Sequence, residues 1–271
     1  MVIRIEGVQG RQFQGQHKRK GKCPLHSNNR THMKNIKRQT AFGCWYHKYL
    51  DKFLPAYALL SMIFCWVFNC CIYSGTQLAL GNQYHYDFTT ALDRQVPFVK
   101  EWILIYVVCY VFWAVNYILV AREGKEHWYR FITAEMLSKI ICGLFFIFLP
   151  TTNVRPEVVG EDFCSWLVRL IYSVDAPYNL FPSIHCLVSW YCYIGIRKSK
   201  KIPVWYQCFS CIFAVLVCAS TQFTKQHYLV DIAGGVFIAQ VCYTCMKRLN
   251  VYQKIESCFE WINRKVFGIT E

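Results

Sequence analysis

Six long apolar segments constrain the fold of this chain more than any other feature of its sequence. They cover residues 53–73, 102–120, 131–149, 183–196, 203–220 and 228–246. A helix needs about 17 to 25 mainly apolar residues to cross the hydrocarbon core of a bilayer. The fourth segment is short for a span, and the sixth contains Asp231. With 55% hydrophobic and only 17% charged residues, the chain has more apolar side chains than a soluble domain can usually bury. The sequence therefore predicts an all-α, polytopic membrane bundle of about six transmembrane helices.

Positive charge is distributed unevenly between the two sides of these segments. Of the 30 Lys and Arg residues, 24 fall in the amino-terminal tail and alternate connections, five fall in the other connections, and Lys139 lies inside a segment. Basic residues are enriched on the cytoplasmic side of membrane proteins. We therefore expect both termini in the cytoplasm. The net charge of +14 is interpreted as a topology signal, and no nucleic-acid partner is expected.

The chain is expected to contain three regions. Residues 1–45 are polar, basic and without hydrophobic periodicity, which predicts a disordered cytoplasmic tail without a cleavable secretory signal. Residues 46–249 would form the six-span membrane domain, and 250–271 an amphipathic cytoplasmic tail. In the long outer connection 150–182, apolar residues recur at helical spacing over 163–171. This pattern predicts a short helix that lies in the membrane interface, with a plain packed connection as the alternative.

Most of the 16 cysteines lie inside the apolar segments, where Cys behaves as a small hydrophobe. Cys208 and Cys211, with Cys242 and Cys245, fall near the cytoplasmic ends of two antiparallel segments. Four thiolates there could hold zinc, but i, i+3 spacing also arises from ordinary helix packing. Zinc binding by these four cysteines stays open, whereas the chemistry expected below needs no metal and no cofactor.

His227 and Asp231 stand at the front edge of the last apolar segment, where ionisable groups are costly and tend to mark function. Their i, i+4 spacing puts them on one helix face. The aspartate can accept the Nδ1 proton of the imidazole and leave Nε2 with its lone pair, an arrangement that activates histidine as a nucleophile or base. A structural pair at a helix end is the alternative.

A second histidine opens the fourth segment from the same side of the membrane. Pro182 and Ser183 suit the first turn of a helix, Ser183 offers a hydroxyl and a free backbone N–H, and His185 follows. Arg155 and Lys225 place positive charges at the same surface. Helix amino termini attract anions, so these clusters together predict a phosphoryl site. Phosphoryl transfer needs a nucleophile, an acid for the leaving oxygen and donors for the equatorial oxygens.

The motifs "PSIH" and, 42 residues after His185, the histidine of "HYLVD" resemble two signature blocks of the type 2 phosphatidic acid phosphatase superfamily. This superfamily also includes vanadium-dependent haloperoxidases and lipid phosphotransferases. The resemblance covers roughly residues 145–240. It implies that His227 attacks phosphorus to form a phosphohistidine, that Asp231 orients it and that His185 protonates the departing alcohol. It also implies phosphoryl-binding roles for Ser183 and Arg155.

The chain departs from the family pattern at two cationic positions. Phe148 stands where the first block has lysine, and Thr221 stands where the third block has arginine, after the retained Ser220. We assign Ser220 and Lys225 to phosphate binding, with Lys225 replacing one missing charge. Two fewer cations should weaken the binding of a dianionic phosphate monoester more than that of a monoanionic diester.

"FPSIH" with "HYLVDIAGG" looks closest to the branch that contains inositol phosphorylceramide synthases, in which Gly234 and Gly235 would let the sixth span pack closely. The leading hypothesis is a lipid phosphatase at the extracytoplasmic face of the plasma membrane. It would hydrolyse phospholipid or polyprenyl phosphate esters, without a prediction of its oligomeric state. The first alternative is a phosphotransferase that moves a phospho-alcohol headgroup to a lipid alcohol.

The second alternative is a non-enzymatic transporter. Transporters carry polar residues near the midplane of several helices, whereas the polar clusters of this sequence gather at one surface. Glu135 and Lys139, one turn apart near the cytoplasmic end of the third segment, are interpreted as a structural ion pair. The sequence therefore favours an enzyme.

Overall fold

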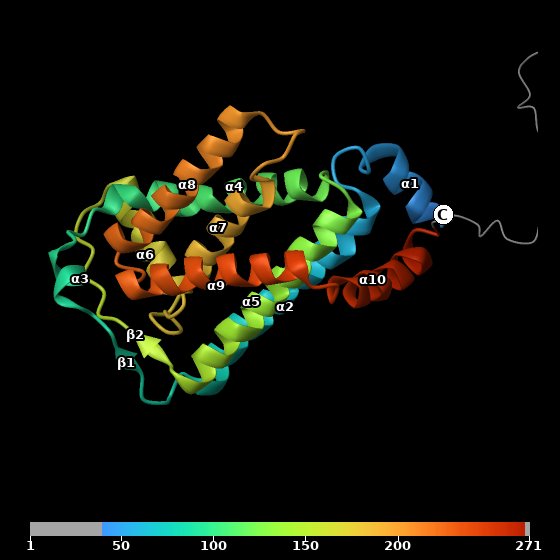
Figure 1. The fold of residues 1–271 in the computed structure, drawn as a ribbon. Helices are drawn as coiled ribbons and strands as arrows, with labels where there is room; N and C mark the ends of the chain where they lie inside the picture. Colours follow the sequence, from blue (N-terminus) through green and yellow to red (C-terminus); the bar gives the residue numbers. More distant parts are fainter. Residues whose placement is uncertain (1–39, 269–271) are drawn as a thin grey trace, which may run out of the picture. The chain divides into compact units, whose positions relative to one another are not determined.

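The structure, a computed structural model, describes residues 40–268, most of which form α-helices (Figure 1). Two short strands, β1 and β2, pair in parallel. The 3-10 turn η1 leads directly into α4. The elements in chain order are α1 (Ala41–Tyr49), α2 (Ala56–Leu80), β1 (Tyr86–Asp87), α3 (Ala91–Gln95), η1 (Lys100–Trp102), α4 (Ile103–Ala121), α5 (Lys125–Phe148), β2 (Thr151–Thr152), α6 (Phe163–Val174), α7 (Ile184–Ile196), α8 (Val204–Phe223), α9 (Leu229–Arg248) and α10 (Tyr252–Val266).

Five helical segments are long and apolar enough to cross a membrane, namely α2, η1 with α4, α5, α8 and α9. The predicted all-α membrane bundle is confirmed, and the chain is a multi-pass membrane protein. The fourth predicted span is α7, which has only 13 residues and is shorter than the roughly 17 that a span needs. Ser183 caps its start by accepting a hydrogen bond from the Cys186 backbone N–H, and a polar connection follows the helix.

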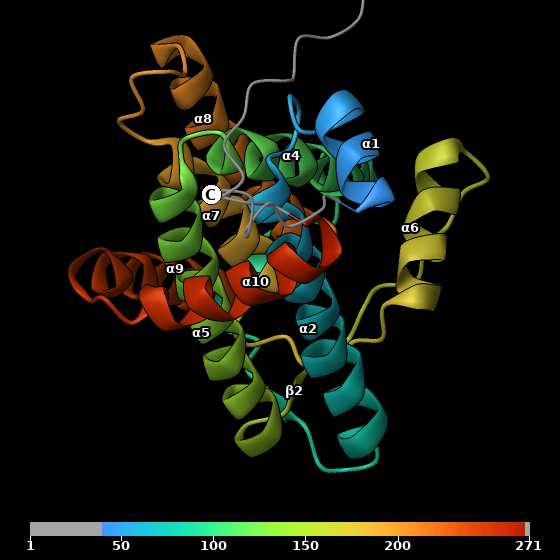
Figure 2. The same ribbon diagram turned by 90° about the vertical axis from the view of Figure 1, so that its right-hand side faces the viewer.

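The two ends of the described chain meet at one end of the bundle. The Thr40 hydroxyl donates to the Val266 carbonyl over 2.6 Å, and α10 lies across α2 and α5 (Figure 2). Helix α1 begins at Ala41, so residues 41–45 of the predicted disordered tail are helical. The rest of that prediction falls on residues 1–39, outside the described residues, and a cytoplasmic location of both termini stays a prediction.

Helix α5 is the most enclosed of the five long helices and packs on α2 and α9. Its large side chains Trp128 and Phe131 are fully buried, and Phe131 meets the ring of Tyr191 from α7 edge to face. A helix that is apolar on most of its surface is typical of the centre of such a bundle. The core therefore lies among α2, α5, α7 and α9.

The helix expected over 163–171 is present as α6. Leu167 and Val168 are buried beside Ile103 and Tyr106 of α4, so one face of α6 packs on the bundle. The opposite face exposes apolar side chains, among them Phe163 and Trp166. This two-sided apolar surface fits an interfacial helix better than a water-exposed loop helix.

Glycines bring α9 against the start of α7, as the sequence suggested for Gly234 and Gly235. A Cβ atom on Gly235 would lie 2.5 Å from the Ser183 carbonyl oxygen, and one on Gly234 would lie 2.6 Å from the Phe181 ring. The Ser183 carbonyl oxygen belongs to the backbone and cannot move aside for a Cβ atom as the end of a flexible side chain can. The contact therefore sets the position of His185 relative to the start of α9.

We expect Gly235→Ala to lower the free energy of unfolding by about 1 to 3 kcal/mol, the usual cost of overpacking a tight contact. Gly75→Ala on α2 is the matched control, because a Cβ there meets no heavy atom within 4 Å, and it should be neutral or slightly stabilising. Thermal unfolding of the two variants in detergent checks the comparison. Equal midpoints would show that the α7 to α9 contact is not tight.

Candidate active site

His227 lies in the short connection between α8 and α9, which the last turn of α8 holds in place. The backbone N–H groups of Gln226 and His227 both donate to the Thr221 carbonyl, over 2.8 and 3.2 Å. The Gln222 side-chain amide donates to the His227 carbonyl over 2.8 Å. These bonds fix the backbone on both sides of the imidazole.

The predicted His227 and Asp231 pair is formed. Nδ1 of His227 lies 3.3 Å from Oδ2 of Asp231 and 3.1 Å from the Leu180 carbonyl oxygen. Both neighbours are acceptors, so Nδ1 carries the proton and Nε2 keeps its lone pair. The buried Asp231 carboxylate also accepts the Tyr228 backbone N–H over 2.8 Å, which ties the pair to the first turn of α9.

The charge of Asp231 also changes the acidity of His227. Burial lowers the pKa of His227, but the hydrogen bond from its ring and the negative charge of Asp231 outweigh burial and hold that pKa above its usual value. Asp175, which lines the same cavity, adds to the increase. The protonated imidazolium is therefore stabilised at this position.

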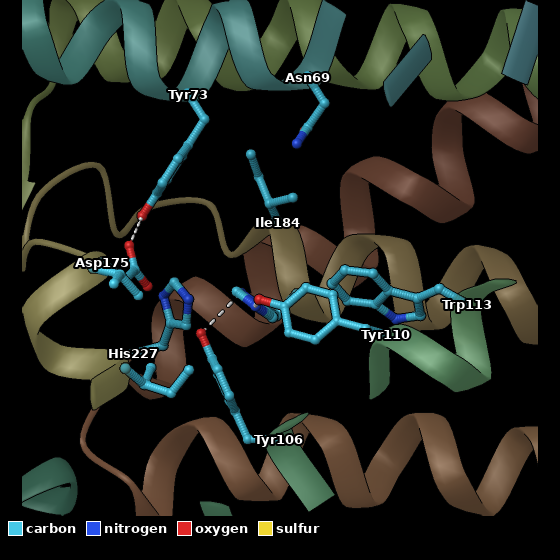
Figure 3. Close-up of a pocket in the computed structure, with 11 residues that line it drawn as sticks. Asn69, Tyr73, Tyr106, Tyr110, Trp113, Asp175, Ile184 and His227 are labelled. Atoms are coloured by element: carbon cyan, nitrogen blue, oxygen red, sulfur yellow. Dashed lines mark hydrogen bonds between the residues drawn. The ribbon is translucent and has the colours of Figure 1, made fainter. Parts of the chain in front are cut away.

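His185 faces the same space from the first turn of α7. The centroids of the His185 and His227 rings are 6.1 Å apart. The Tyr106 and Tyr110 hydroxyls of α4 lie 3.4 Å from Nδ1 and 3.2 Å from Nε2 of His185, respectively. Two histidines from distant parts of the sequence thus share one cavity of about 240 Å³, and Figure 3 shows His227, Tyr106 and Tyr110 converging on it.

A second cavity, of about 320 Å³, is also lined by His227 and has more charged side chains than the first, so we call it the polar cavity. Arg155 lines it, and the guanidinium donates to the Asp175 carbonyl and to the Gln226 side chain while it stacks on Tyr172 at 4.6 Å. Nε of Arg155 is buried without a hydrogen-bond partner. His227 lines both cavities, so the two cavities adjoin at this residue.

Lys225 lines the same polar cavity, but its ammonium group donates to the carbonyls of Asp93, over 2.9 Å, and Val96. Burial lowers the pKa of Lys225, and the negative charge of Asp93 partly offsets the decrease. The side chain therefore joins the α3 region to the site. Its charge acts on the polar cavity from a fixed position.

The two predicted serines do not line either cavity. Ser183 caps α7, and its backbone N–H, which the sequence suggested was free, donates to the Asp231 carbonyl over 3.1 Å. The Ser220 hydroxyl donates to the Val217 carbonyl of its own helix over 2.7 Å. Both residues are fully buried. Their contacts shape the backbone around His185 and His227, and the direct phosphoryl contacts predicted for them stay predictions.

Several cavity residues were missed by sequence reasoning. Asp175 follows the last turn of α6 and accepts a hydrogen bond from the Tyr73 hydroxyl of α2 over 2.6 Å (Figure 3). Arg94 adds a third cation to the polar cavity. A signal for the aromatic wall was present, because Tyr106, Tyr110 and Trp113 recur at i, i+4 and i+7, the spacing of one helix face.

Within residues 40–268, no group of three or more His, Cys, Asp or Glu side chains is arranged to hold a metal ion. This applies to Cys208, Cys211, Cys242 and Cys245, of which the first and last are exposed and Cys242 is buried. The zinc site left open by the sequence is not assembled in this geometry.

Comparison with known proteins gives one match. Residues 78–245 match a family model described as the PAP2 superfamily, and this range contains His185, His227 and Asp231. No curated protein and no solved structure matches the chain. The matched range includes more than half of the 271 residues and both histidine motifs that the resemblance rested on. The chain belongs to the PAP2 superfamily, the type 2 phosphatidic acid phosphatases and their relatives.

Proposed function

We propose that the protein is a membrane enzyme that cleaves a lipid phosphate ester through a phosphohistidine formed on His227. One observation carries the proposal. Nδ1 of His227 is engaged by two acceptors, and this leaves Nε2 for a cavity that His185 also lines. Members of this superfamily are phosphatases and phosphotransferases, and this favours an enzyme over the transporter alternative.

The first half-reaction uses the two imidazoles in complementary roles. Nε2 of His227 attacks phosphorus, the bond from phosphorus to the alcohol oxygen breaks, and His185 gives its proton to that oxygen. Asp231 keeps the attacking ring oriented and stabilises the positive charge that the ring gains. In the second half-reaction, His185 takes a proton from water, the water oxygen attacks phosphorus, and His227 leaves as neutral imidazole.

The two cavities suit the two parts of a lipid phosphate. The cavity with His185 has an aromatic wall of Tyr106, Tyr110 and Trp113, which suits the lipid side of the ester. The polar cavity holds the cations Arg94, Arg155 and Lys225, which suit phosphoryl oxygens and the approach of water. We place this cavity at the extracytoplasmic face of the plasma membrane, in agreement with the charge asymmetry of the sequence.

A pH profile tests the role of Asp231. Because Asp231 holds the pKa of His227 above the usual value of about 6.5, kcat/KM should fall as pH drops through a midpoint above that value. In Asp231→Asn the negative charge is gone, so the pKa of His227 falls and the acid limb should move to lower pH. The plateau value of kcat/KM should also fall, by about 100- to 10,000-fold, because the tautomer of His227 is no longer fixed. If the acid limb did not move in Asp231→Asn, a group other than His227 would be responsible for it.

The acceptor of the phosphoryl group distinguishes two versions of this proposal. Phe148, where the family carries lysine, is exposed at the end of α5, and Thr221 uses its hydroxyl on the Cys218 carbonyl. The loss of these two cations favours a monoanionic diester, and therefore a phosphotransferase similar to inositol phosphorylceramide synthases, as the second candidate.

Product analysis with purified protein separates these candidates. The hydrolase releases free phosphate from a phosphatidate or a polyprenyl diphosphate without a second lipid. The phosphotransferase forms a new phospholipid only when a diester donor and a lipid alcohol are both supplied. If neither product forms from any of these substrates, the proposed function is wrong.

A further inference from the structure

A third cavity, of about 440 Å³, lies between α2 and α4 inside the bundle. It adjoins the cavity of the two histidines, because Asn69, Tyr110, Trp113 and Ile184 line both. Its walls are mainly apolar, and they come from α2, α4, α5 and α7. Nothing in the chemistry described above uses this space.

The inner wall of this cavity carries two buried charges. Glu135 and Lys139 of α5 are only 3% and 1% exposed, and both line the cavity. They lie in the middle of α5, and not near its cytoplasmic end as the sequence was interpreted. A structural ion pair is also an incomplete description. Nζ of Lys139 is 3.8 Å from Oε1 of Glu135, which is too long for a hydrogen bond, and Oε2 of Glu135 has no hydrogen-bond partner.

A buried carboxylate without a full set of partners is costly inside a membrane. The unpaired Oε2 atom therefore calls for a ligand that supplies a donor beside the Lys139 ammonium. A hydroxyl group does so, since it donates to the Glu135 carboxylate and accepts from the Lys139 ammonium. The net charge of the pair is zero, so an ionised phosphate placed there would face the Glu135 carboxylate at close range. The pair therefore selects an uncharged polar group.

The outer margin of the cavity points to the source of this ligand. Trp66 of α2 is 68% exposed and Tyr110 of α4 is 48% exposed, although both line the cavity. In a multi-pass protein, exposed apolar side chains in the middle of spanning helices face lipid. A ligand can therefore reach Glu135 and Lys139 from the bilayer, between α2 and α4.

We propose that the cavity between α2 and α4 binds a neutral lipid alcohol, with its hydroxyl groups held by Glu135 and Lys139 and its chain between α2 and α4. The binding itself requires no catalysis. The further role of this lipid, as the alcohol that leaves or accepts the phosphoryl group next to His185, rests on the proposed function.

The test uses full-length His227→Ala protein in lipid nanodiscs, in which binding is separated from turnover. A long-chain alkylglycerol with a photoreactive diazirine in its chain is compared with its dimethyl ether, which keeps the acceptor oxygens but has lost both donors. We expect the alkylglycerol to label peptides of α2 and α4 about tenfold more than the ether. A preference of this size is expected when one buried acceptor atom, Oε2 of Glu135, is left without a donor.

The decisive variant is the double replacement Glu135→Leu with Lys139→Leu. Replacing both partners of a buried pair by apolar groups usually preserves the fold, and this variant should label equally with the two probes. Glu126→Gln, at the exposed pair with Arg130 on the same helix, is the matched control and should retain the tenfold preference.

Equal labelling by the two probes in the parent protein would overturn the proposal, as would a preference that survives the double replacement. Stronger labelling by the phosphorylated alkylglycerol that is lost in the double replacement would overturn it too, because Glu135 and Lys139 would then select a charged lipid. Each result leaves the phosphohistidine chemistry untouched. Conversely, failure to find a phosphohistidine leaves the binding result unchanged.

Discussion

His227→Ala is expected to lower kcat for the lipid phosphate ester by at least about 1,000-fold, the scale seen when a covalent nucleophile is removed. The loss follows from the position of the ring, because no other imidazole in residues 40–268 has Nδ1 held by a carboxylate and a carbonyl while lining the cavity with His185. The initial rate with purified, folded variant measures the effect.

His127→Ala is the matched control for this substitution. His127 is also partly buried and hydrogen-bonded, with Nε2 2.8 Å from the Gly195 carbonyl oxygen, but it belongs to the first turn of the 24-residue α5, whose other end leads to the site. Its replacement should change thermal stability and leave kcat of the folded fraction within about twofold. If His227→Ala kept the kcat of the parent protein, the nucleophile would be another residue.

His185→Ala is expected to lower kcat by about 100- to 10,000-fold, the usual contribution of a general acid. The loss should depend on the leaving group. An unactivated lipid alcohol leaves with a localised negative charge and needs the His185 proton, whereas a nitrophenol leaves readily without it. The loss of kcat in His185→Ala should therefore be larger for an alkyl phosphodiester than for a nitrophenyl phosphodiester, and the two rates are measured side by side.

Tyr110→Phe provides the control for packing around His185, since it removes only the hydroxyl that lies 3.2 Å from Nε2 and keeps the ring. It should retain most of the activity toward the nitrophenyl ester. A loss in His185→Ala of the same size for both esters would contradict a general acid and assign His185 a positioning role.

The parts of the site that follow from local spacing were predictable from the sequence. The i, i+4 separation of His227 and Asp231 places them on one turn wherever a helix begins near residue 229, and the structure has the bond at 3.3 Å. The apolar segments likewise mark the long helices directly. The short α7 matches the one segment whose length was below that of a full span.

The parts that depend on packing between distant helices could not be read in advance. Asp175 lies just beyond the apolar pattern of 163–171, and its place on the cavity wall depends on α6 packing against α4 and on the Tyr73 hydroxyl. The Ser183 N–H is free when α7 is considered alone, but Gly235 lets α9 approach until the Asp231 carbonyl accepts it.

The buried pair in α5 illustrates the same limit. Its i, i+4 spacing predicted an ion pair, and the two charges do lie close together. The sequence did not reveal that Oε2 of Glu135 would remain unpaired beside a cavity of about 440 Å³, because the walls of that cavity come from four helices.

Trapping of the covalent intermediate tests the central claim most directly. The purified protein is mixed with a lipid phosphate ester labelled with ³²P, quenched in alkali within milliseconds, and digested for mass spectrometry. The account predicts an acid-labile, alkali-stable phosphoryl group on His227, absent in His227→Ala and accumulated when water attack is slowed. Label on another residue, or turnover without any labelled protein, would contradict it.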